Sequence, residues 1–194
     1  MRQSAPCGTG WRRRSGRAVA VGCSRRRSWT PPGRSWPSGK TNEITRFRPL
    51  LDRISDLPDT VITADALHCQ REHVTYLAER GAHWILTVKG NQPSLHAQLA
   101  ALPWRHVPVA HQAREKGHGR AERRTMKTTA VAAGLAFPHA AQAIQIVRRR
   151  RPLTCTKWST ETVYAITSLT VIQARPADLA RFICGHWGID DRLH

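Results

Sequence analysis

The stretch Thr60–Gln70, TVITADALHCQ, decides the fold. It opens with four β-branched residues, Thr60 to Thr63, which favour a short buried strand. Asp65 stands where this strand should end, and a helical spacing of apolar residues begins at Arg71. Open α/β sheets place their chemistry at the carboxyl ends of strands, but an Asp between a strand and a helix is also an ordinary capping or turn residue. The residues alone leave both interpretations of Asp65 open.

A second strand of the same kind is predicted from Trp84 to Val88. Gly81 can end the helix between the two strands, and Pro93 can begin the helix that follows. A strand, a helix and a strand joined by short connections usually form a parallel pair. We therefore expect an α/β fold, with an amphipathic helix over residues 44–54 before the first strand.

Residues 103–171 differ in character from this part, and we expect a β-rich insertion there. Strands are predicted over 125–131, 143–147 and 162–169, and the preceding segment is polar and basic. The run Arg148, Arg149 and Arg150 is either a solvated loop or a set of contacts to DNA phosphate. A last helix is predicted over 177–194, weakened by two glycines.

Charge is the strongest compositional signal. The 194 residues contain 31 Lys and Arg against 13 Asp and Glu, a net charge of +18. Such an excess indicates a polyanionic partner, most simply nucleic acid, with an anionic membrane surface as the alternative. No apolar run approaches the roughly 18 residues that span a bilayer. The five cysteines are scattered and form no C-x-x-C pair, so neither a disulfide framework nor a zinc site is indicated, and we expect a cytoplasmic protein.

Residues 1–38 are expected to be a disordered basic tail. They hold no Asp or Glu and consist largely of Arg, Ser, Gly, Pro and Trp without a period. Such a composition cannot bury enough apolar surface to offset the entropy of ordering. A nucleic-acid arm, a transit peptide and translation out of frame all fit, and we favour the last. The folded domain is then residues 39–194.

Six blocks in this domain resemble a known family. In order they are KTNEI with FRPLLD, VITADALHCQREH, HWILTVKGNQPSL, HGRAERRT, ETVYAITSL and GHWGIDDRLH. Together they resemble the DDE-class transposases of bacterial insertion sequences. The resemblance implies a partial ribonuclease-H-like fold, a mixed sheet flanked by helices. It also implies a truncated copy that lacks the family's first strands.

The resemblance implies a chemistry as well. Such transposases hold two Mg²⁺ ions with three carboxylates and use them to cleave and join DNA. Asp65 matches the second catalytic Asp, and Asp190 stands where the family has its catalytic Glu. Asp191 takes the neighbouring Asn position and can serve as a substitute ligand or be a surface charge. The first catalytic Asp has no counterpart, because residues 1–38 contain none. Whether this chain is an enzyme is therefore left open, and we expect an inactive fragment.

Its expected partner is DNA, at element ends and target, and the intact family member is expected to form a homodimer. The alternative function is a basic DNA-binding module without catalysis. His68 and His73, which flank the start of the second helix, are interpreted as helix-surface residues and not as zinc ligands. Besides the arginine run, the candidate DNA contacts, each of which can instead be an exposed loop residue, are Lys89, Asn91, Gln92, His118 and Arg120.

Overall fold

The computed structural model describes residues 18–21, 43–117, 119–131 and 135–192, with side chains over 44–117, 119–131 and 135–185. Its elements in chain order are β1 (Ala18–Val21), α1 (Glu43–Leu51), β2 (Val61–Ala64), the 3₁₀ turn η1 (Ala66–His68), α2 (Arg71–Glu79), β3 (His83–Val88), α3 (Pro93–Ala101), β4 (His111–Gly117), β5 (Arg120–Ala130), β6 (Gln142–Pro152), β7 (Ser159–Thr167) and α4 (Pro176–Arg192). In this part of the chain no helix is both long enough and apolar enough to cross a membrane.

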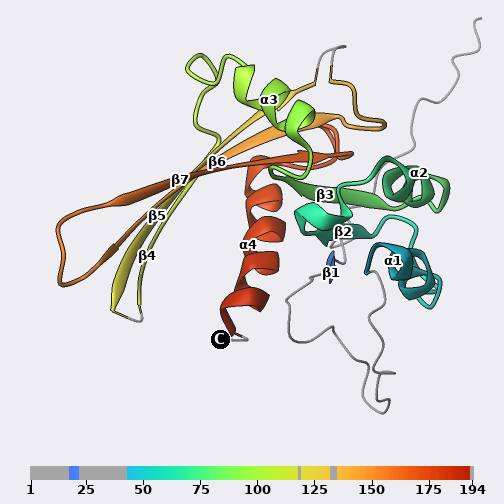
Figure 1. Cartoon of the computed structure of the whole chain (residues 1–194), viewed down its shortest axis with the longest axis horizontal. Helices are drawn as coiled ribbons and strands as arrows, with labels where there is room; N and C mark the ends of the chain where they lie inside the picture. The colour runs from blue at the N-terminus through green and yellow to red at the C-terminus, as the bar shows by residue number, and fades with distance from the viewer. Residues whose placement is uncertain (1–17, 22–42, 118, 132–134, 193–194) are drawn as a thin grey trace, which may run out of the picture.

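The described strands form one mixed sheet in the order β1-β2-β3-β7-β6-β5-β4. β1, β2 and β3 run parallel, whereas β7, β6, β5 and β4 add in antiparallel fashion beyond β3. This confirms the α/β fold and the parallel pair of β2 and β3. The far ends of β4 to β7 extend beyond the helices as a twisted arm (Figure 1). We call residues 111–125 and 147–162 the β arm.

Helices cover both faces of the sheet because its central strands are apolar on both sides. On β3, Trp84 and Leu86 join the core cluster under α1, α2 and α3, whereas Ile85 joins the cluster under α4. The same alternation divides Ile62 from Val61 on β2. Figure 1 shows α3 and α4 on opposite sides of the sheet.

The predicted disorder of residues 1–38 is wrong for Ala18–Val21. These residues form β1, which pairs with β2 in a register that places Val21 beside Ala64. An edge strand offers a row of backbone donors and acceptors, and a short apolar stretch can satisfy them even inside a basic segment. The edge of β2 is therefore paired. The rest of residues 1–38 lies outside the described part of the chain.

The β-rich region was only partly predicted. The expected strands correspond to β5, β6 and β7, each of which is longer or shifted, and β4 was missed. β4 has no apolar alternation, and its backbone pairing with β5 explains its strand conformation. Arg148, Arg149 and Arg150, for which a solvated loop was one of two alternatives, are part of β6.

Leu86 offers a test of the central packing. It is fully buried in β3, between β2 and β7. Leu86→Ala should lower the free energy of unfolding by about 2–5 kcal/mol, because the core around it can collapse only in part. Ile172→Ala is the control, since Ile172 is 93% exposed, and it should stay within about 0.5 kcal/mol of the unsubstituted chain. Urea unfolding measures both variants, and equal stabilities would contradict this description of the core.

Candidate active site

Asp65 lies at the carboxyl end of β2 and caps the turn that follows. Its Oδ1 accepts a hydrogen bond from the Ala66 amide at 2.6 Å, at the start of η1. Its side chain is 34% exposed. The two interpretations of Asp65 are therefore compatible, because one carboxylate oxygen caps the turn while the group as a whole remains open to solvent.

The loop after β3 fastens the loop that carries Asp65. Lys89 Nζ lies 3.3 Å from Asp65 Oδ1. The Asn91 side-chain amide donates to the Ala66 carbonyl at 2.7 Å, and the Gln92 amide donates to the Cys69 carbonyl at 2.9 Å. Asn91 and Gln92, predicted to contact DNA, thus use amide donors to fix the Asp65 loop. Lys89 remains well exposed beside the carboxylate.

Asp65 is the predicted metal ligand whose side chain the structure describes. Among the described residues, no group of three or more His, Cys, Asp or Glu could hold a metal ion. Asp190 and Asp191 fall on α4, but their side chains lie outside the described part of the chain, as does His118. Burial raises the pKa of the neighbouring Cys69 thiol to about 12, so Cys69 is no nucleophile near neutral pH.

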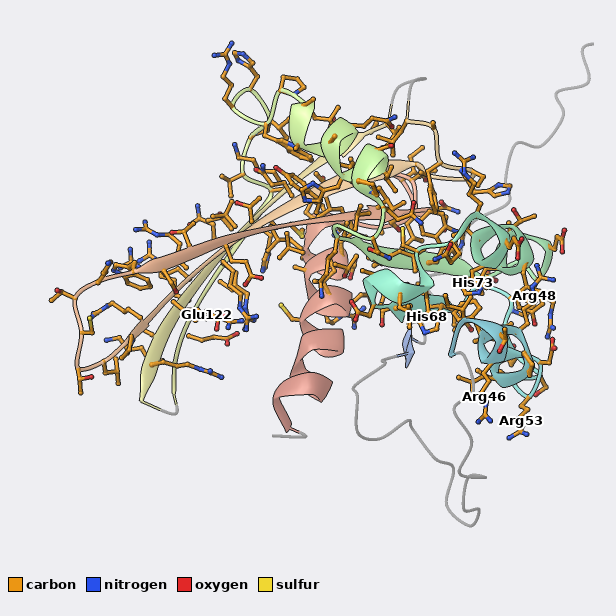
Figure 2. The ribbon with its side chains drawn as sticks, viewed as in Figure 1. Arg46, Arg48, Arg53, His68, His73 and Glu122 are labelled. Atoms are coloured by element: carbon orange, nitrogen blue, oxygen red, sulfur yellow. The ribbon has the colours of Figure 1, made fainter. Side chains whose placement is uncertain are left out.

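His68 and His73 are buried, which corrects the prediction that they lie on a helix surface. Both rings stack on Phe47 of α1, with centroid separations of 5.0 and 4.1 Å. Figure 2 labels the two histidines. They therefore join α1 to η1 and α2, behind Asp65. Burial lowers the pKa of His73 below its usual range and keeps the ring neutral.

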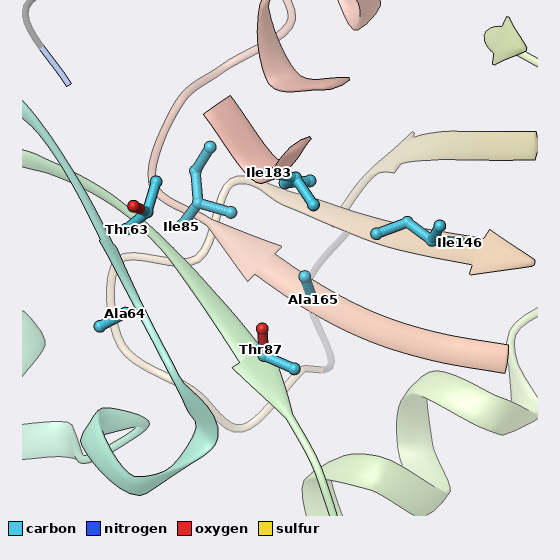
Figure 3. A pocket seen from close by; sticks show the side chains of 7 residues that line it. All are labelled: Thr63, Ala64, Ile85, Thr87, Ile146, Ala165 and Ile183. Carbon is cyan, nitrogen blue, oxygen red and sulfur yellow. The ribbon is translucent and has the colours of Figure 1, made fainter. Parts of the chain in front are cut away.

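A small cavity on the α4 side of the sheet lies close to Asp65 along the chain (Figure 3). Its lining is mostly aliphatic, with the hydroxyls of Thr63 and Thr87 as its polar side-chain groups. The full lining is Thr63, Ala64, Ile85, Thr87, Ile146, Ala165 and Ile183. Because no titratable group lines it, we interpret it as a packing gap between the sheet and α4.

The arginine run of β6 is divided by strand alternation. Arg148 and Arg150 both turn to the buried carboxylate of Glu122, and Arg150 Nε lies 3.3 Å from Glu122 Oε2. Arg124 Nε lies 2.5 Å from Glu122 Oε1, and Figure 2 shows Glu122 on the arm. Burial alone would lower the pKa of Arg124, but the hydrogen bond to Glu122 and its charge raise it instead. Arg149 is exposed on the other face. Sequence reasoning missed Glu122, because its partners come from two strands.

The comparison with family models decides the identity. Residues 36–189, most of the chain, match the model described as "Transposase DDE domain". The chain belongs to this transposase family. The match includes β2 with Asp65, the loop after β3 and the whole β arm.

Two similar curated proteins are named as putative transposases, and a third is named as uncharacterized. "Putative transposase YncI" of Escherichia coli O157:H7 is 42% identical over 57 residues, which cover 29% of this chain and 14% of that protein. "H repeat-associated putative transposase YbfD" of E. coli K12 is 31% identical over 90 residues, 44% of this chain and 35% of that protein. "Uncharacterized protein in dhlA 3'region" of Xanthobacter autotrophicus is 36% identical over 89 residues, 44% of this chain and 30% of that protein.

The matched part of the chain thus spans about a third or less of the length of these relatives.

Among solved structures, a S-adenosylmethionine-dependent methyltransferase from Clostridium acetobutylicum matches at 5% identity with a TM-score of 0.22, over 63% of this chain and 44% of that one. A TM-score this low supports no argument about fold or function.

The buried histidine predicts a pH dependence of stability. The folded-state pKa of His73 is lowered, so below its ordinary pKa of about 6.5 the unfolded chain binds more protons than the folded one. Stability is therefore full above that pH and falls as the pH drops toward the folded-state pKa. His73→Phe keeps an aromatic ring against Phe47 and should flatten this fall between pH 7.5 and about 5.5. His106 is exposed, so His106→Asn should leave the pH dependence of stability unchanged. Urea unfolding at the two pH values compares the variants.

Proposed function

We propose that this chain descends from a Mg²⁺-dependent DNA cleavage and strand-transfer enzyme, with Asp65 as a metal ligand, and that this copy does not cleave DNA. The observation that carries the proposal is the place of Asp65 at the carboxyl end of β2, open to solvent and inside the family match. We further propose the finer fold to be ribonuclease-H-like, over residues 39–194 with 103–171 as an insertion. The parallel β2 and β3 and the flanking helices support it.

The residues present fit a divalent cation in part. The exposed carboxylate of Asp65 supplies the oxygen ligand that Mg²⁺ prefers, and a strand end holds it in place. When bound by a complete site, such ions activate the attacking hydroxyl and stabilise the leaving oxygen. In this chain Asn91 and Gln92 fix the loop of Asp65, and Lys89 neutralises its charge. Asp190 and Asp191 on α4 are the further proposed ligands.

Two features support inactivity. The resemblance places Asp190 where the family has Glu. Asp is one methylene shorter, which shifts the carboxylate by about an ångström, and metal sites tolerate such shifts poorly. On the other side of Asp65, β1 ends with Val21 beside Ala64, and residues 1–42 contain no carboxylate side chain. The neighbouring strand therefore supplies no acidic ligand.

DNA is the proposed partner, and the cytoplasm the proposed place of action, with a homodimer proposed for the intact relatives. The second candidate function is DNA binding without catalysis, which the concentration of arginine on the β arm favours. Arg120 at the tip of β5 and Arg149 on β6 remain proposed contacts, as does Lys89 beside Asp65. His118 stays a prediction from the sequence.

The proposed inactivity predicts that the purified chain leaves supercoiled plasmid intact in the presence of Mg²⁺. The reason is that the described residues hold no group of three or more His, Cys, Asp or Glu that could hold a metal ion, whereas such chemistry uses several carboxylates. Gel electrophoresis of the plasmid, with and without EDTA, measures the result. Nicking that requires Mg²⁺ and disappears in Asp65→Ala would show that the copy is active.

The ion pair at the site makes a second prediction. Asp65→Asn should remove most Mn²⁺ binding, because it removes the charged ligand. Lys89→Gln should raise Mn²⁺ affinity about 1.4–5-fold, since an exposed ion pair contributes only about 0.2–1 kcal/mol. Lys157→Gln removes the same charge from an exposed position at the far end of the arm and should change little. Electron paramagnetic resonance of free Mn²⁺ measures all three, and equal affinity of the Asp65→Asn variant would refute the ligand role.

A further inference from the structure

The strands of the β arm divide their charged side chains between two faces. Side chains alternate along a strand, and the pairing places Arg114 beside Arg123 and Arg123 beside Arg149. The opposite positions of these strands include Met126 and Ile146, which pack in the core cluster under α4. The three arginines therefore lie on the face directed away from α4, which we call the outer face.

The outer face of the arm is cationic and has no carboxylate. By the same alternation its charged residues are Arg114, Lys116, Arg123, Arg149 and Arg151. The acidic residues of the arm, Glu115, Glu122 and Glu161, fall on the other face. There Glu115 and Glu122 pair with Arg124, which also donates to Cys184 of α4 at 3.5 Å. Within the described part of the arm, negative charge is thus confined to the face toward α4.

Trp158 gathers three of the outer-face arginines. The guanidinium carbons of Arg123, Arg149 and Arg151 lie 4.9, 5.5 and 5.2 Å from the centroid of its ring. The negative face of an indole attracts cations, so the ring offsets the mutual repulsion of three like charges. Arg123 and Arg149 are exposed, and Arg151 donates to the Cys155 carbonyl. The ring therefore holds three guanidinium groups together: Arg123 and Arg149 are open to solvent, and the half-buried Arg151 adds the third positive charge.

We propose that this outer face binds the phosphate backbone of duplex DNA, with Arg123, Arg149 and Arg151 as contact residues and Trp158 as the residue that positions them. The proposal rests on the proposed function only in naming DNA as the polyanion. Arginine suits this role because its planar fork of donors matches a phosphate. Arg148 and Arg150, which share the strand, are committed to Glu122 and take no part.

The width of the arm indicates how it meets the duplex. Its four strands lie about 4.8 Å apart, so the outer strands are separated by about 14 Å before side chains are added. The major groove is about 12 Å wide and admits a helix or a two-stranded ribbon. The arm therefore lies across the backbone and does not enter the groove. Contacts of this kind fix position without reading base sequence, so binding is independent of sequence.

The test compares two triple variants of the full chain. The outer-face variant carries Arg123→Gln, Arg149→Gln and Arg151→Gln. The control carries Arg53→Gln, Arg175→Gln and Arg181→Gln, which remove the same charge from exposed positions outside the arm. Each phosphate contact contributes about 0.9 to the slope of log affinity against log salt, so the outer-face variant should lose about 2.7 of slope and the control under about 1. Fluorescence anisotropy with two duplexes of unrelated sequence, in EDTA and a potassium chloride series, measures both.

Trp158 is tested separately because its variants keep every charge. Trp158→Leu should weaken binding by releasing the three arginines, whereas Trp158→Phe, which retains an aromatic face, should restore most of the affinity. Thermal melting by circular dichroism confirms that each variant is folded. Equal loss of slope in the two triple variants, or no binding of duplex by the full chain, would overturn the proposal. The binding assay contains EDTA and therefore does not depend on a bound metal ion. If the metal-binding and cleavage experiments contradict the proposed function, the result for the outer face still holds.

Discussion

The pairing of β3 with β7 is the interaction on which the rest of the structure depends. It is where the parallel strands that carry Asp65 meet the antiparallel strands of the arm. At the end of this pairing, the backbone amide of Trp84 donates to Ser168 Oγ at 3.0 Å. The backbone carbonyl of Trp84 accepts a hydrogen bond from Thr167 Oγ1 at 2.6 Å. Thr167 and the Trp84 side chain are fully buried, so the backbone groups here are satisfied by protein and not by water. The register between β3 and β7 thus fixes the position of the parallel strands relative to the antiparallel strands.

A buried carboxylate plays a comparable part within the arm. Glu122 would be costly to bury alone, and three guanidinium groups converge on it from β5 and β6. This arrangement draws Arg124, Arg148 and Arg150 to one side of the sheet. Side chains alternate along β6, so Arg149 then lies on the outer face. The positive charge of the outer face is therefore linked to the ion pairs of Glu122 on the face toward α4. Strand alternation therefore divides the arginine run, and Glu122 pairs with the members on its own side.

What the sequence could predict depended on how local the signal was. β2 and β3 were predictable because runs such as Thr60 to Thr63 are rich in β-branched residues, and the position of Asp65 followed from them. β4 was not predictable from the sequence, because its polar residues adopt the strand conformation only through pairing with β5. β1 depended in the same way on the free edge of β2. The burial of His68 and His73 came from Phe47, more than twenty residues earlier in the chain.

The candidate site shows the same limit. A carboxylate at a strand end is visible in sequence, but the partners that restrain it come from another loop, as Asn91 and Lys89 do here. The outer face of the arm needs neither of these residues, because its geometry depends on the registers of β5, β6 and β7 and on the ring of Trp158. Loss of an acidic ligand beside Asp65 leaves those registers unchanged. The proposed metal site and the proposed DNA contacts therefore rest on different parts of the fold, so a change in one need not disturb the other.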